Sequence, residues 1–353
     1  QETPVSKTVK AMLMLPLNTG TGMTGSENNM DFYCGVLLAA RDLGLNGTDI
    51  ELCTYDISGG SARAVNEAAS GCDFIIGPIS TGDLREVLTG VPSSIPVISP
   101  IDPRAEVLAK GHVNFIQTPA STLAQYADLV SWMNEEAGPE DRIVVIYEKG
   151  MRETPETAAV DSLMQKSGRT WSSFSYSILE GRNVLSSLES LMNPASVNRV
   201  LIVSESEAFV NDVVRNLKLM IHDKYGIVLY GPSRTRGFET LDVDDLHAVN
   251  LHVSLSYYVD YDSPEVQEFL LKYRALFNTE PGAFAFQGYD IMTYFVRMRT
   301  RYGKDWTDRL SETGTERMLQ SDFRFRRKGE GGLENSGIRR VVYGSGYSVT
   351  QQK

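Results

Sequence analysis

Hydroxyl side chains follow two short apolar segments in the first third of the chain. Phe74–Ile76 predicts a strand buried on both faces, and Ser80 and Thr81 follow it where a helix begins. Ile95–Ile98 predicts a second buried strand, with Ser99 directly after it. If the strands are parallel, these hydroxyls and the free N–H groups of the helix meet at one sheet edge, where open α/β sheets bind small ligands. The chemistry predicted is hydrogen bonding to a carboxylate or another acceptor group.

The elements that position these residues alternate between strand and helix with short connections. This pattern runs from Val9 to Thr118 and restarts after Pro119, with a strand centred on IVVIY near residue 145. Such alternation predicts parallel sheets with right-handed crossovers. The last hundred residues differ, since they contain two helix patterns, a Gly-rich turn and a final strand near residues 338–343. We therefore expect an α/β fold of two doubly wound, Rossmann-like lobes.

Bulk composition excludes several classes of function. The 353 residues suffice for two domains, and a hydrophobic content of 42% supports substantial cores. A net charge of −11 argues against a nucleic-acid partner. No apolar run approaches the roughly 18 residues of a membrane helix, and no signal-peptide pattern is present in this chain.

Motifs for catalysis are weak or missing from the sequence. Gly20, Gly22 and Gly25 match G-x-G-x-x-G, but the spacer before them is too long for a tight strand-to-helix turn, and a flexible loop is the favoured interpretation over a nicotinamide site. There is no G-x-S-x-G, no P-loop, and no histidine pair at metal-ligand spacing. We expect no cofactor, no metal and no enzymatic activity.

Two further groups have structural interpretations. Cys34, Cys53 and Cys72 are odd in number, which rules out complete intramolecular pairing, and we expect buried free thiols. Along residues 323–326, strand alternation points the phenylalanines inward and the arginines outward to solvent.

A family resemblance connects these segments. The order FIIGP, ST, IPVIS and FIQTP, preceded by FYCGVLLAARDL and followed by IVVIYEKG, VLYGPS and FAFQGYD, resembles the type I periplasmic binding proteins. Within them it is similar to the branched-chain (Leu/Ile/Val) amino acid ABC transporter substrate-binding family. The resemblance covers nearly the whole chain from Val9. It implies lobes joined by a three-crossing hinge, with lobe 1 at 9–118 plus 255–321 and lobe 2 at 119–250 plus 322–353.

The resemblance also implies where a ligand would bind. In lobe 1 it points to a hydroxyl at Thr81 with Ser80 adjacent, to Ser99, and to the segment of Ile101 and Asp102, which offers a backbone carbonyl. In lobe 2 the contacts implied or adjacent to implied positions are Tyr147, Arg152, Glu205, Ser233 and Arg234.

The chain departs from the family pattern at two of these places. The acidic residue that pairs with a ligand ammonium falls on Ser233, with Arg234 next to it, and a threonine hydroxyl is replaced by Pro103. Because arginine suits planar anions, the hypothesis is a small polar ligand, either an amino acid or an organic anion, and not simply a branched-chain amino acid. Asp102 and Glu205 remain as acceptors.

The function expected from the resemblance is that of an extracytoplasmic, periplasmic solute-binding protein that closes over its ligand by hinge bending and delivers it to a membrane permease. The alternative is a cell-envelope sensory or structural module on the same fold, with a degenerate cleft and cell-wall association.

Overall fold

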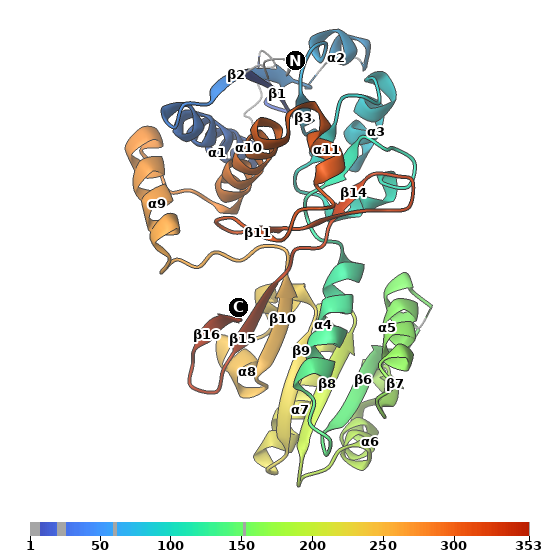
Figure 1. The fold of residues 1–353 in the computed structure, drawn as a ribbon. Coiled ribbons are helices and arrows are strands. Elements are labelled where there is room, and N and C mark those ends of the chain that lie inside the picture. The colour runs from blue at the N-terminus through green and yellow to red at the C-terminus, as the bar shows by residue number, and fades with distance from the viewer. Residues whose placement is uncertain (1–7, 20–25, 59–61, 151–152, 353) are drawn as a thin grey trace. The chain divides into compact units, whose positions relative to one another are not determined.

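The computed structural model describes residues 8–19, 26–58, 62–150 and 153–352. The chain divides into two compact units, and it passes between them three times (Figure 1). Unit 1 comprises residues 1–121 and 256–337, and unit 2 comprises residues 122–255 and 338–353. Each crossing therefore has a defined position: after Ser121, after Leu255 and after Gly337.

The third crossing differs from the prediction, which placed it near residue 322. Residues 322–337 belong to unit 1 because they complete its sheet: β14 (Leu333–Asn335) pairs parallel to β5 (Phe115–Gln117), and β13 (Phe325–Arg327) pairs antiparallel to β14. This pairing joins segments that are more than 200 residues apart in the chain, so a local sequence pattern could not predict it.

Unit 1 is a seven-stranded sheet in the order β13-β14-β5-β4-β3-β1-β2. Its remaining strands are β1 (Thr8–Leu15), β2 (Asp49–Asp56), β3 (Phe74–Ile76) and β4 (Val97–Ser99), with a small separate pair of β11 (Glu316–Arg317) and β12 (Asp322–Phe323). Its helices are α1 (Glu27–Leu45), α2 (Ala62–Ala68), α3 (Thr81–Gly90), α9 (Pro264–Phe277), α10 (Ala283–Tyr302) and α11 (Trp306–Arg309), with the 3-10 turns η1 (Pro103–Leu108) and η4 (Gly303–Asp305).

Helices cover both faces of this sheet. One face packs against α1, α10 and α11, and the other against α2, α3 and η1. Along the first face α1 and α10 lie side by side (Figure 1). Their backbones approach closely through Gly35 and Gly288: a Cβ atom on Gly288 would lie 2.2 Å from the carbonyl oxygen of Phe32, and one on Gly35 would lie 2.0 Å from that of Ala285. This contact requires glycine at both positions.

Unit 2 is a second seven-stranded sheet, in the order β16-β15-β10-β9-β8-β6-β7. Its strands are β6 (Arg142–Glu148), β7 (Ser172–Tyr176), β8 (Val197–Val203), β9 (Gly226–Gly231), β10 (Leu251–Leu255), β15 (Arg339–Tyr343) and β16 (Val349–Gln352). Its helices are α4 (Thr122–Glu136), α5 (Pro155–Lys166), α6 (Val184–Leu191), α7 (Glu207–His222) and α8 (Val243–Ala248), with the turns η2 (Ile178–Asn183) and η3 (Ser233–Gly237).

The first five strands of each unit along the chain are parallel and have the same order. Unit 1 runs β2-β1-β3-β4-β5 and unit 2 runs β7-β6-β8-β9-β10, so in each the chain reverses direction at the first strand. This is the doubly wound order that the alternating pattern predicted. In both units the carboxyl ends of the parallel strands therefore form an edge with a topological switch point, where such sheets bind ligands.

Two smaller expectations have mixed outcomes. Phe323 and Phe325 are buried and Arg324 and Arg326 are exposed, as alternation predicted. All three cysteines are free, but the expectation that they are buried is wrong: Cys34 and Cys72 are half-buried, and Cys53 is exposed on β2, a strand in which no side chain is fully buried. No helix among the described residues is long and apolar enough to span a membrane.

Candidate functional site

In unit 1 the candidate residues gather at the carboxyl ends of β3 and β4. Ser80 caps α3: its hydroxyl accepts a hydrogen bond from the Asp83 N–H (3.1 Å) and donates one to the Asp83 carboxylate (2.7 Å). The next residue, Thr81, donates from Oγ1 to Oδ2 of Asp102 (3.0 Å), which lies 21 positions later in the chain. The segment that follows β3 and the segment that follows β4 are therefore directly hydrogen-bonded.

Asp102 is the charged residue of this cluster. It accepts hydrogen bonds from the Arg104 N–H (3.0 Å), from Arg104 Nε (2.9 Å) and from Thr81. Burial alone would raise the pKa of Asp102, but these donors outweigh burial and hold the pKa below its ordinary value. Asp102 is thus an ionised group whose acceptor capacity is largely engaged by its own unit.

Two buried polar atoms in the same cluster form no hydrogen bond with any described residue. Ser99 and Gln117 are neighbours in register at the ends of β4 and β5, and both are almost fully buried. Gln117 Nε2 donates to the carbonyl of Asp102 (2.9 Å), but Gln117 Oε1 and Ser99 Oγ have no hydrogen-bond partner among the described residues. Because an unpaired buried polar atom is costly, these two atoms are candidate hydrogen-bonding groups at this edge. Ile101, next to them, packs its side chain against the α1–α10 core, so only its backbone is offered at this edge.

In unit 2 the corresponding edge contains Glu205, directly after β8. Its Oε1 lies 3.5 Å from the hydroxyl of Tyr126 on α4, a long contact. Burial raises the pKa of Glu205, and the nearby positive charge of Arg234 only partly offsets this. Ser206 then caps α7 by accepting from the Phe209 N–H (3.4 Å). Glu205 is therefore a half-buried acceptor whose nearest hydrogen-bond donor, Tyr126, is held only loosely.

Arg234 and Ser233 follow β9, the strand beside β8. Ser233 is half-buried at the start of η3, and Arg234 is exposed and forms no ion pair with any described residue. An exposed guanidinium whose charge acts on a half-buried carboxylate gives this edge both a donor and an acceptor for a charged ligand.

Of the remaining two candidates of unit 2, Tyr147 does not join this group. The side chain of Tyr147 is only 2% exposed, packs in the core beneath α4 and α5, and donates its hydroxyl to Asp161. It is a structural residue because β6 is covered on both faces, so a side chain near its end points into a core. Arg152 lies outside the described residues, as do Gly20, Gly22 and Gly25 of the glycine motif.

Sequence reasoning missed three polar residues at these edges. Gln117 ends an apolar strand segment, and Glu148 ends β6, where its carboxylate accepts from Ser204 Oγ (2.6 Å). A polar residue that closes an apolar strand is a usable signal for both. Tyr126 had no such signal, since it lies within an amphipathic helix pattern.

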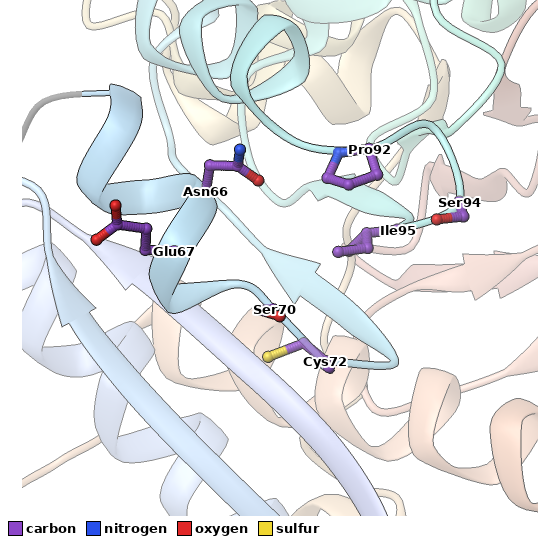
Figure 2. Close-up of a pocket in the computed structure, with 8 residues that line it drawn as sticks. Asn66, Glu67, Ser70, Cys72, Pro92, Ser94 and Ile95 are labelled. Atoms are coloured by element: carbon purple, nitrogen blue, oxygen red, sulfur yellow. The ribbon is translucent and has the colours of Figure 1, made fainter.

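Figure 2 shows a surface pocket elsewhere in unit 1. It measures about 560 Å³ and is lined by residues before β3 and β4, among them Asn66, Glu67, Cys72 and Ser94. These residues lie at the amino ends of the strands, the sheet edge opposite to Thr81 and Asp102. Within the described part of the chain, no group of three or more His, Cys, Asp or Glu residues could hold a metal ion.

No protein-family model matches the chain, and no curated protein matches it. Solved structures do. A putative branched-chain amino acid ABC transporter protein from Rhodospirillum rubrum aligns with a TM-score of 0.70 at 14% identity, covering 98% of this chain and 100% of that one. An ABC transporter substrate-binding protein from Desulfitobacterium hafniense, in complex with Leu, aligns with a TM-score of 0.62 at 13% identity over the same shares.

A third structure is the branched-chain amino acid transporter substrate binding protein from Streptococcus pneumoniae, in complex with isoleucine, with a TM-score of 0.53 at 15% identity over 98% and 99% of the two chains. The chain has the type I periplasmic binding protein fold. The fold predicted from the ordered motifs is confirmed, and at these identities the fold is what the comparisons establish.

Proposed function

We propose that this protein binds a small polar solute through the carboxyl edges of its two sheets and delivers it to a membrane permease. The observation that carries the proposal is the whole-chain match of its fold to ABC transporter substrate-binding proteins, two of them solved with Leu or isoleucine. Candidate ligand-binding residues of both units lie at the sheet edges where doubly wound sheets bind ligands.

The chemistry of unit 2 supports a solute with a carboxylate and, next to it, an ammonium group. Arg234 is exposed and forms no ion pair with any described residue, so it suits a ligand carboxylate. Glu205 is a half-buried acceptor, so it suits a ligand ammonium group. The family position for the acid falls on Ser233, but Glu205 on the neighbouring strand end supplies a carboxylate instead. We therefore favour an amino acid over a simple organic anion.

The chemistry of unit 1 supports hydrogen bonding to the same solute. Ser99 Oγ and Gln117 Oε1 have no hydrogen-bond partner among the described residues. Thr81 is held beside them because both Thr81 and Gln117 hydrogen-bond to Asp102. These groups offer neutral donors and acceptors, while Ile101 offers backbone only. Ser80 contributes less in this proposal because its hydroxyl is engaged by Asp83.

A binding role of this kind places the protein outside the cytoplasm, in the periplasm or an equivalent compartment, with a permease as its partner. The structural neighbours are solute-binding transport proteins, and we propose that this chain likewise performs no reaction of its own.

A thermal-shift panel tests the proposal. The purified chain is heated with L-leucine, L-isoleucine, the other amino acids, organic acids, sugars and NAD in turn. A compound present at a hundred times its Kd adds about 2.7 kcal/mol to the stability of the folded state, which raises the melting temperature by about 5 °C or more. We expect amino acids to form the responding class.

Three results would change the proposal. A response restricted to organic acids would leave the binding function and remove the role of Glu205 toward an ammonium group. A response to NAD alone would replace it with a nucleotide function. No response across the panel, with calorimetry also silent, would count against solute binding.

A further inference from the structure

Three buried polar residues of unit 1 lie where the chain leaves that unit. Gln287 and Asp290 are one turn apart on α10, and Asn335 ends β14 just before the third crossing. All three are at most 3% exposed. Buried amide and carboxylate groups are retained only when they are well hydrogen-bonded, so their partners show what they hold together.

Asn335 fastens the first crossing segment to the third. Its Nδ2 donates to the carbonyls of Thr118 (2.8 Å) and Asp322 (3.0 Å), and its Oδ1 accepts from the N–H groups of Arg324 (2.8 Å) and Gly337 (2.8 Å). Thr118 lies just before the first crossing and Gly337 just before the third.

Asp290 and Gln287 connect the second crossing segment to residues 319–322, which Asn335 in turn joins to the third crossing. The Asp290 carboxylate accepts from three consecutive backbone N–H groups, those of residues 319–321, at 2.9 to 3.0 Å. Gln287 Oε1 accepts from Ser321 Oγ (3.0 Å), and Gln287 Nε2 is 3.3 Å from the hydroxyl of Tyr257, in the second crossing segment. The second segment also reaches the first, because Ser256 Oγ donates to the carbonyl of Ala120 (3.0 Å).

The same residues hold the segment that contains the candidate ligand contacts. Gln287 Nε2 donates to the carbonyl of Pro100 (3.0 Å), and Thr118 Oγ1 donates to the carbonyls of Ser99 (2.7 Å) and Pro100 (3.1 Å). Residues 99–102 are therefore bonded directly to the first crossing segment, and through Gln287 to the second crossing segment and to Ser321.

We propose that Gln287, Asp290 and Asn335 are positioning residues that join residues 99–102 and all three crossing segments into one cooperative hydrogen-bonded network. A solute held at residues 99–102 then acts on every connection to unit 2 at once. The consequence for the solute rests on the proposed function, whereas the network itself does not.

Amide hydrogen exchange of the full chain, with no solute added, tests the network. Three amides report on the network. Thr118 N–H, at the first crossing, donates to the Ser99 carbonyl (3.1 Å), and Tyr258 N–H, at the second, donates to the Gln320 carbonyl (2.9 Å). Ser321 N–H donates to Asp290 (3.0 Å) and reports on the residues that Asn335 joins to the third crossing. In Asn335→Ala we expect exchange at all three to rise together by about tenfold or more, while the amides of β1 report any global unfolding.

Unit 2 provides a matched control. Asn198 is also a fully buried asparagine, and its Nδ2 donates to three carbonyls, those of Asn193, Ser196 and Gly226. Asn198→Ala removes the same chemistry far from the crossings in sequence, so it should destabilise its own loop and leave the three reporter amides within about twofold.

A second variant keeps the test decisive if Asn335→Ala does not fold. Gln287→Met preserves the side-chain length and removes the bonds to Pro100 and Ser321, and we expect the same joint rise. Exchange that rises only at the amide nearest the substituted side chain, with the other two reporters unchanged, would overturn the proposal. Since no solute is used, this result is independent of whether any compound of the thermal-shift panel binds.

Discussion

The two units have the same strand order but differ in how they hold the acid at the carboxyl edge of the sheet. Asp102 of unit 1 is engaged by Thr81 and Arg104, and its pKa is lowered. Glu205 of unit 2 has one long contact to Tyr126, and burial raises its pKa. Acidic residues that follow a parallel strand can therefore differ in both hydrogen bonding and pKa. Their neighbours decide whether they stabilise a loop or remain available to a ligand.

The unit interiors differ in a related way. Unit 1 brings α1 and α10 together by backbone contact at two glycines. Unit 2 instead has a polar and aromatic cluster at the end of α4, in which Glu136 accepts from Trp132 Nε1 (2.6 Å), from the Tyr230 hydroxyl (2.6 Å) and from Arg199 Nη1 (3.2 Å). Unit 1 should therefore be sensitive to added volume and unit 2 to lost charge.

The largest effect is expected from Gly288→Ala in unit 1. Its Cβ would lie 2.2 Å from the Phe32 carbonyl oxygen and 3.1 Å from the Val36 nitrogen, and backbone atoms on a packed helix cannot yield as a flexible side chain would. We expect a loss of about 4 kcal/mol or more in the free energy of unfolding, measured by denaturant titration of both units.

Gly44→Ala is the control for this substitution. Gly44 lies in α1, and a Cβ atom there would meet nothing within 4 Å, so the variant should gain up to about 1 kcal/mol from helix propensity alone. Equal losses in the two variants would show that the close approach of the helices is not what holds unit 1.

A smaller effect is expected from Glu136→Gln in unit 2. Burial alone would raise the pKa of Glu136, but hydrogen bonds from His252, Tyr230 and Trp132 lower it to about 2. About a third of the side chain is exposed, so solvent screening reduces the stabilisation to about 1 to 2 kcal/mol. The variant should lose this amount at neutral pH, with Glu140→Gln in the following exposed loop as the neutral control.

The pH dependence of this contribution has a definite sign. Because the folded-state pKa is below the ordinary value near 4.5, the stabilisation is present above that pH and is lost as the pH falls toward 2. The wild-type protein should therefore lose stability more steeply than Glu136→Gln between about pH 4.5 and 2. If stability falls with pH equally in the two proteins, the ionised Glu136 carboxylate does not stabilise unit 2.

Much of the fold could be predicted because its strands and helices carry local patterns. The bounds of β3 agree with those predicted from its apolar run. Residues 322–337 could not be assigned in this way, since their place in unit 1 depends on pairing with β5 more than 200 residues away. Local pattern specifies an element but not its distant partner.

The candidate site shows the same limit at the level of side chains. Strand ends predicted Thr81 at a sheet edge, and the family resemblance implied Asp102, Glu205 and Arg234. They could not predict that Tyr147 points into a core, because both faces of β6 are apolar and alternation does not distinguish them. Nor could they predict that Asp102 is engaged and Glu205 is not, since that depends on side-chain distances.

The smallest expected effect sharpens the comparison of the two acids. If an amino acid such as L-leucine responds in the thermal-shift panel, Glu205→Gln should weaken its affinity by about tenfold, since a neutral amide replaces the carboxylate facing the ammonium group. Asp102→Asn should change affinity less but lower stability, because its carboxylate bonds Thr81 and Arg104 instead. Calorimetric titration measures both.

The pH dependence of that affinity gives an independent measure. Glu205 has a raised pKa, so it is protonated at a higher pH than an ordinary glutamate, and binding should weaken as the pH falls through that raised value. The Glu205→Gln variant should lack this dependence, while Asp102→Asn should retain it. If only Asp102→Asn removes the pH dependence, the carboxylate that faces the ligand's ammonium group belongs to unit 1. Asp102, and not Glu205, would then be the acid available to the ligand.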